Sequence, residues 1–136
     1  VHYNSNRLGV RVKGVPLEWA RTDGGEAGLH PSNIHDCAYP IGGVNCTGED
    51  AVAMTCDGPS LGGFVCPVTI VKAELWKLGQ VKPNDIIKFI PIERSLAIEM
   101  EHIQDEFIKK IGIEEDLKFN WQFTLAKLPL EKALLD

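Results

Sequence analysis

The sequence predicts a mainly β protein, a barrel or sandwich of short strands with a short helix and one longer helix towards its end. Three observations lead to this class. Runs of strand-forming residues recur over the first 92 residues, loops rich in glycine and proline separate them, and a helical apolar period appears only beyond residue 94. At 136 residues the chain is long enough for one domain with a buried core.

The strands are expected in four places before residue 72. They cover residues 8–12, 37–44, 51–56 and 64–71. Pro40 and Gly42-Gly43 are expected to break the strand 37–44, and Pro67 indicates that the strand 64–71 lies at a sheet edge or contains a bulge. Residues 45–50 are expected to form a turn, and residues 24–36 and 57–63 two glycine-rich loops. Because both loops follow similar strand ends, they are expected to come together at one mouth of the barrel.

The second half changes character. Residues 72–78 predict a short helix that stops at Gly79, residues 81–85 a β-turn, and residues 86–92 the clearest strand of the chain. Apolar residues then recur every three or four positions, which predicts an amphipathic helix over residues 95–111, with Lys109 and Lys110 favourable at its end and Gly112 as its stop. We expect a first unit over residues 1–92, followed by a helix and connecting tail over residues 93–136. Residues 113–136 are expected to be a partly ordered tail or a connection to another domain.

Composition excludes several classes of function. The net charge is -5, so no basic field attracts nucleic acid or an anionic membrane surface. No apolar run approaches the roughly 20 residues that span a bilayer, and no secretory signal is recognisable. The first residues already resemble the middle of a domain, so we expect a piece of a longer, cytoplasmic protein.

Four cysteines stand nine or ten residues apart, and none forms a CxxC pair. The favoured interpretation is buried thiols in a reducing compartment. Disulfides or a metal ion remain alternatives. The four are Cys37, Cys46, Cys56 and Cys66.

The stretch most suited to a functional site is the first glycine-rich loop, residues 24–36 (GGEAGLHPSNIHD). Its glycines allow positive φ or close approach of a ligand, and Pro31 keeps His30 extended. Three chemistries are disfavoured by the residues present. A triad of Ser32 with His30 or His35 and Asp36 is disfavoured because neighbours in one loop seldom converge. A metal site on Glu26, His30, His35 and Asp36 is disfavoured because no helix is expected here to align the two histidines. A phosphate-binding loop is disfavoured because no P-loop lysine follows the glycines.

A neutral polar pocket remains. Backbone N–H groups and Asn33 would donate to a carbonyl, while Glu26 or Asp36 would accept from an amide N–H, which suits a small amide-like ligand. The competing interpretation is a tight loop whose polar side chains only cap its own backbone. For Arg7 the choice lies between a solvated charge and an arginine that braces the loop or binds a carboxylate or carbonyl.

The same residues carry a resemblance. The run 24–36, the preceding NRLGVRV at 6–12, and the following DGPSLGGF at 57–64 and AELWKLGQ at 73–80 resemble the biotin-dependent urea carboxylase family, the carboxylase part of urea amidolyase. The resemblance covers about residues 1–92. It implies the second half of the first carboxyltransferase subdomain, with a cyclophilin-like β-barrel.

The implied reaction is transfer of CO2 from carboxybiotin to urea, which forms allophanate. Biotin would sit on a carrier domain, ATP and Mg would be used by a biotin carboxylase domain, and a second carboxyltransferase subdomain would complete the enzyme; none of these lies in this chain, which should be inactive alone. No metal need take part in the transfer step.

By this resemblance Asn33, His30 and Asp36 are the candidate catalytic residues. The candidate substrate-binding residues are Glu26, Ser32, His35, Arg7, Ser60, Gly62 and Gly63. A carboxylase for guanidine or another urea analogue, and a non-catalytic interaction module of the same fold, remain alternative interpretations.

Overall fold

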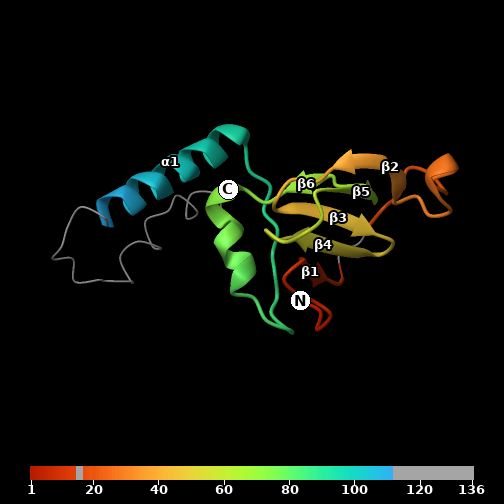
Figure 1. The fold of residues 1–136 in the computed structure, drawn as a ribbon, viewed down its shortest axis with the longest axis horizontal. Coiled ribbons are helices and arrows are strands. Elements are labelled where there is room, and N and C mark those ends of the chain that lie inside the picture. The colour runs from red at the N-terminus through yellow and green to blue at the C-terminus, as the bar shows by residue number, and fades with distance from the viewer. Residues whose placement is uncertain (15–16, 112–136) are drawn as a thin grey trace. The chain divides into compact units, whose positions relative to one another are not determined.

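The structure, a computed structural model, describes residues 1–14 and 17–111. It divides into two compact units, Val1–Pro91 and Ile92–Asp136. Every named strand belongs to the first unit, and the helix α1 (Arg94–Ile111) belongs to the second (Figure 1). The predicted mainly β class, with one short helix and one longer helix near the end, is confirmed.

The strands of the first unit form two antiparallel sheets. One has the order β1-β4-β3-β6 and the other pairs β2 with β5. Just beyond β5, the Val65 N–H donates to the Ser32 carbonyl at 3.0 Å and the Val65 carbonyl accepts from the Cys46 N–H at 2.9 Å, so this residue bridges the two sheets. The strands are β1 (Gly9–Val12), β2 (Asn33–Ala38), β3 (Gly43–Thr47), β4 (Asp50–Met54), β5 (Leu61–Phe64) and β6 (Val68–Thr69).

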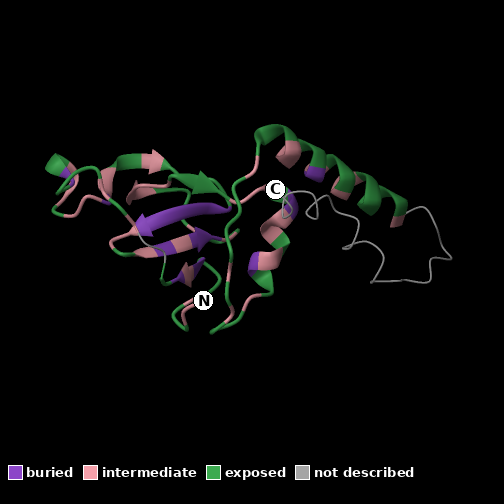
Figure 2. Cartoon of the chain, turned by 180° about the vertical axis from the view of Figure 1, so that it is seen from behind, coloured by how far each residue is buried: buried purple, intermediate pink, exposed green. Residues whose placement is uncertain are grey.

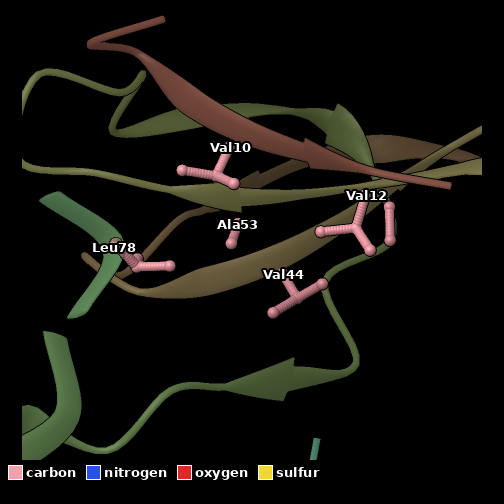
Figure 3. Close-up of a cluster of buried hydrophobic side chains, with 6 residues drawn as sticks. Val10, Val12, Val44, Ala53 and Leu78 are labelled. Atoms are coloured by element: carbon pink, nitrogen blue, oxygen red, sulfur yellow. The ribbon is translucent and has the colours of Figure 1, made fainter. Parts of the chain in front are cut away.

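The core lies on one face of the four-stranded sheet. Alternation along β1 sends Val10 and Val12 to the same side, opposite Ala53 and Ala51 of β4. The 3-10 helix η2 (Lys72–Gly79) adds Leu78 (Figure 3). β3 is buried along most of its length, as its continuous purple ribbon shows (Figure 2). Small alanines on β4 let the neighbouring valines pack closely.

Several predicted boundaries were wrong. The expected loops 24–36 and 57–63 end inside strands, because β2 begins at Asn33 and β5 at Leu61, and the expected strand 37–44 is divided between the end of β2 and the start of β3. Asn45 to Thr47 continue β3, so only Gly48 and Glu49 form the turn. The expected strand 64–71 is split, because β5 ends at Phe64 and β6 holds only two residues after Pro67, which has no N–H for a ladder. The expected strand 86–92 is absent from the described structure, since residues 86–92 have no backbone hydrogen bonds to any described residue.

The helix α1 confirms the predicted apolar spacing, and Lys109 and Lys110 lie in its last turn. Only Met100 is fully buried on it. The expected stop at Gly112 and the tail 113–136 lie outside the described residues. None of the described helices combines the length and apolar composition that a membrane crossing requires.

The four cysteines differ in environment, and all are free thiols. Cys46 is buried as expected, Cys37 and Cys66 are half-buried, and Cys56 is exposed, so the expectation of burial was wrong for Cys56. Burial raises the pKa of the Cys46 and Cys66 thiols, because desolvation disfavours the thiolate.

Tyr39 ties the two strands of the smaller sheet together. Its hydroxyl accepts from the Phe64 N–H at 2.6 Å and donates to the Phe64 carbonyl at 3.0 Å, and the residue as a whole is only 8% exposed. Burial raises the pKa of this phenol above its ordinary value, and neighbouring thiols and Asp36 raise it further.

We therefore expect stability to fall at alkaline pH. The folded chain binds the Tyr39 proton more tightly than the unfolded chain, so this contribution is complete below about pH 10, the pKa of an exposed tyrosine, and is lost as the pH rises through the folded pKa. Tyr39→Phe should lower the free energy of unfolding by about 1–3 kcal/mol at neutral pH and flatten its decline above pH 10. Urea denaturation at a series of pH values measures both; an unchanged alkaline slope in the variant would contradict the assignment.

Candidate functional site

An open depression of about 590 Å³ lies between the first glycine-rich loop and the paired strands β2 and β5. The expected meeting of the two glycine-rich loops was wrong. Since β2 and β5 are antiparallel, the loop before β2 lies beside Phe64 and the loop before β5 lies beside Tyr39, so only Gly63 of residues 57–63 lines the depression. The short 3-10 helix η1 (Gly25–Ala27) forms one rim. The lining residues are Glu26, Ala27, Asn33, Ile34, His35, Asp36, Gly63 and Phe64.

A bulge in β2 explains why consecutive residues share this depression. In a regular strand His35 and Asp36 would point to opposite faces. The register against β5 shifts between Asn33, which faces Phe64, and Cys37, which faces Gly62. Such an irregularity redirects side chains, and both His35 and Asp36 are exposed on the depression.

Asn33 is held by the glycines of the loop. Its Oδ1 accepts from the His30 N–H at 3.2 Å. A Cβ on Gly24 would stand 2.8 Å from the Asn33 Cβ, and a Cβ on Gly28, whose φ is 151°, would stand 2.8 Å from its Cγ. Only glycine leaves room for the amide at both places. The amide nitrogen makes no hydrogen bond to any described residue, so it is available to a ligand.

Ser32 and His30 belong to an internal network instead. Ser32 is fully buried, and its Oγ lies 2.8 Å from His30 Nδ1 and accepts from the Gly48 N–H at 3.1 Å. His30 Nε2 lies 3.4 Å from Glu49 Oε1. Serine, histidine and a carboxylate are thus in contact, but the serine has no access to a substrate and the carboxylate is Glu49 rather than Asp36. This network fastens the loop to the β3–β4 turn.

The remaining candidates lie away from the depression. Arg7 is exposed, with its Nε 3.9 Å from Asp57. Ser60 is exposed and its carbonyl accepts from the Tyr39 N–H. Gly62 lies against the Tyr39 ring. Five of the ten candidate residues therefore line the depression: Glu26, Asn33, His35, Asp36 and Gly63. The other five do not line it: Arg7, His30, Ser32, Ser60 and Gly62. In the described part of the chain, no three His, Cys, Asp or Glu side chains are grouped as metal ligands.

Arg21 is a residue that the sequence did not single out. Its guanidinium donates through Nε and Nη2 to the Pro31 carbonyl, at 3.2 and 3.0 Å, and through Nη2 to the Asn33 carbonyl. The two carbonyls flank the buried Ser32. An arginine just before a loop rich in backbone carbonyls is a weak signal, because nothing in the spacing shows which carbonyls it reaches.

We expect Arg21→Ala to loosen this loop without unfolding the chain. Three donated hydrogen bonds are lost from an exposed position, so the free energy of unfolding should fall by only about 1 kcal/mol. Amide hydrogen exchange across residues 30–35 should nevertheless accelerate about tenfold. Arg21→Lys is expected to behave like Arg21→Ala, because a lysine ammonium cannot span two carbonyls as the planar guanidinium does. Exchange as slow as in the wild type in both variants would show that Arg21 does not hold these two carbonyls in place.

Comparison with known proteins adds the family. Residues 1–91 match the family model "Carboxyltransferase domain, subdomain A and B". The chain is 56% identical over 111 residues to the urea amidolyase of Lachancea kluyveri and 54% identical to that of Saccharomyces cerevisiae, covering 82% of this chain and 6% of each relative. The crystal structure of the Kluyveromyces lactis urea amidolyase matches with a TM-score of 0.78 at 52% identity, covering 88% of this chain and 7% of that one.

The chain therefore spans about one sixteenth of the length of the curated relatives it matches. The family model covers the whole of the first structural unit, which holds both sheets and the depression. The chain belongs to the family of carboxyltransferase domains, subdomain A and B.

Proposed function

We propose that this chain is part of the carboxyltransferase of a biotin-dependent urea carboxylase, and that its depression binds urea as the acceptor of CO2, giving allophanate. The observation that carries the proposal is the convergence of Glu26, Asn33 and Asp36 on one open depression. The relatives named urea amidolyase support the choice of substrate. A biotin carboxylase domain using ATP and Mg, a biotinyl carrier domain and a second carboxyltransferase subdomain would belong to the rest of the protein.

Urea is flat, with one strong acceptor and four N–H donors. The free amide nitrogen of Asn33 would donate to the urea oxygen. The carboxylates of Asp36 and Glu26 would accept from the urea N–H groups and so orient one nitrogen for attack on CO2. As that nitrogen loses its proton, negative charge spreads to the oxygen, and the fixed Asn33 donor stabilises it.

We propose that the biotin ring binds at the same surface. When bound, carboxylated biotin supplies CO2 and a basic ureido group that receives the urea proton. Gly63 and Phe64 would hold its ring, because Gly63 presents no side chain there: a Cβ on Gly63 would lie 3.2 Å from the Ile34 carbonyl oxygen and 3.5 Å from Asp36 Oδ1. The glycine therefore keeps open the space beside the Asp36 carboxylate.

His30 and Ser32 are proposed to position the loop rather than to contact urea. Their hydrogen bonds to each other and to Gly48 hold the backbone immediately before Asn33. The buried Ser32 has no surface left for a ligand. Arg7, Ser60 and Gly62 lie away from the depression, and we assign them no contact with urea.

A guanidine carboxylase is a second candidate, favoured by one observation. The lining includes two carboxylates, Glu26 and Asp36, and neither arginine nor lysine. A guanidinium cation would pair with such carboxylates more strongly than neutral urea would.

The test measures ATP cleavage by the full-length biotinylated protein with urea or guanidine as the acceptor. Cleavage stimulated by urea supports the proposal, and cleavage stimulated only by guanidine supports the second candidate. Stimulation by neither substrate would reject both. The 136-residue chain alone should show no stimulation by either substrate, because it would lack the domains that carboxylate biotin.

A further inference from the structure

We propose that, in the longer protein, the residues that precede Val1 form a β-strand that pairs antiparallel with residues 86–91 and joins them to the edge of the four-stranded sheet at β1. The inference rests on the proposal that this chain is part of a longer enzyme. It does not depend on which substrate that enzyme carboxylates.

Residues 86–91 have the character of a strand but no strand partner among the described residues. Their sequence, IIKFIP, is rich in β-branched and aromatic residues. None of their backbone N–H or C=O groups is hydrogen-bonded to a described residue. Ile87 packs on the core, whereas Ile86 is 96% exposed and Phe89 42% exposed. An apolar run that is anchored on one side and unpaired along its backbone offers an edge to another strand.

Val1 shows where that strand begins. Its nitrogen donates to the Asp85 carbonyl at 2.6 Å, and its carbonyl accepts from the Asn84 N–H at 3.0 Å. This is an antiparallel pair with a bulge, in which Asn84 and Asp85 together face Val1. Asn84 has a φ of 73°, the left-handed conformation that such a bulge uses at its first position.

His2 shows where the other edge of the strand lies. The His2 N–H donates to the Arg11 carbonyl of β1 at 2.8 Å. Successive residues of a strand present their backbone groups to opposite edges. Val1 and His2 therefore already behave as the end of a strand that runs between β1 and the segment after Asp85.

Continuing this antiparallel register predicts the contacts. The residue two before Val1 would face Ile87, and the residue four before Val1 would face Phe89. The N–H groups of Ile87 and Phe89 would then point to the new strand, whereas the N–H of Lys88 would point away. The relatives are many times longer than this chain, so the family's proteins contain ample chain to supply these residues.

This alternation provides a matched pair of variants in the full-length protein. Hydrogen exchange should show the wild-type amides of Ile87 and Phe89 protected by about 100-fold or more relative to an unstructured peptide. Phe89→Pro removes an N–H that faces the new strand and should abolish the protection of the remaining amide, that of Ile87. Lys88→Pro removes an N–H that faces away and should keep it. Phe89→Ala, which retains its N–H, controls for loss of the ring.

A cross-link identifies the partner. A photoreactive benzoylphenylalanine in place of Phe89 in the full-length protein should attach to the ten residues that precede Val1. Attachment to residues 112–136, to another part of the protein or to a second molecule would overturn the proposal. So would exchange of the Ile87 and Phe89 amides at the rate of an unstructured peptide, or equal loss of protection in Lys88→Pro and Phe89→Pro.

Discussion

Replacing Asn33 by alanine is expected to reduce urea-stimulated ATP cleavage by the full-length biotinylated protein by about 100-fold or more. Removing one preorganised donor to a developing oxyanion typically costs this much. The Asn33 amide nitrogen is unpaired among the described residues and lies on the depression with Asp36 and Glu26. Initial rates at saturating and limiting urea give kcat and kcat/KM separately; both should fall, because the interaction strengthens as charge develops.

Asn33→Asp separates binding chemistry from loop structure. The aspartate keeps an oxygen that accepts from the His30 N–H, as Asn33 Oδ1 does at 3.2 Å. It lacks the N–H donor and adds a negative charge beside Asp36. We therefore expect activity as low as in Asn33→Ala, with a thermal stability close to that of the wild type. Activity near the wild-type level in Asn33→Asp would show that the oxygen, and not the donor, is what the reaction needs.

Gly62→Ala is expected to have the largest effect on stability. A Cβ at this position would stand 2.8 Å from the Tyr39 ring and 2.9 Å from its hydroxyl. That ring cannot retreat, because its hydroxyl bridges the Phe64 N–H and carbonyl. Overpacking of this kind costs about 1–3 kcal/mol, and movement of Tyr39 would add the loss of its two hydrogen bonds. Urea denaturation of the wild type and the variant measures the difference.

Gly63→Ala is the matched control for this prediction. Its Cβ would meet the Ile34 carbonyl oxygen at 3.2 Å and Asp36 Oδ1 at 3.5 Å, which is tight but short of a collision. We expect a loss of stability below about 1 kcal/mol and a clear loss of urea-stimulated activity, since the added methyl group enters the depression. If Gly63→Ala destabilised the chain as much as Gly62→Ala, the difference in their surroundings would not be the cause.

Much of the local structure could be predicted because it depends on neighbours in the sequence. The spacing of Leu96, Met100 and Phe107 was sufficient for α1, and the alternation at Val10 and Val12 was sufficient for β1. The same reasoning failed for residues 86–92. Their composition is that of a strand, but a strand exists only where another backbone accepts its hydrogen bonds.

The candidate site was likewise predicted only in part from the sequence. Composition alone pointed to residues 24–36 as a polar loop and to Glu26, Asn33 and Asp36 as groups for a flat amide-like molecule. It could not separate these from His30 and Ser32, which have similar side chains in the same loop. Burial and contact separated them, since Ser32 is enclosed with His30 and Gly48. Arg21 went unnoticed because its carbonyl partners lie 10 and 12 residues away.

The sequence by itself determined the mainly β class, the long helix and the run of residues, 24–36, that holds most of the candidate site, because strand alternation, helical period and glycine content act over a few residues. Only the tertiary structure decided which side chains of that loop share one depression. That outcome depends on the bulged pairing of β2 with β5 and on the hydrogen bonds from Arg21 to the Pro31 and Asn33 carbonyls. These interactions join residues that are not neighbours in the sequence.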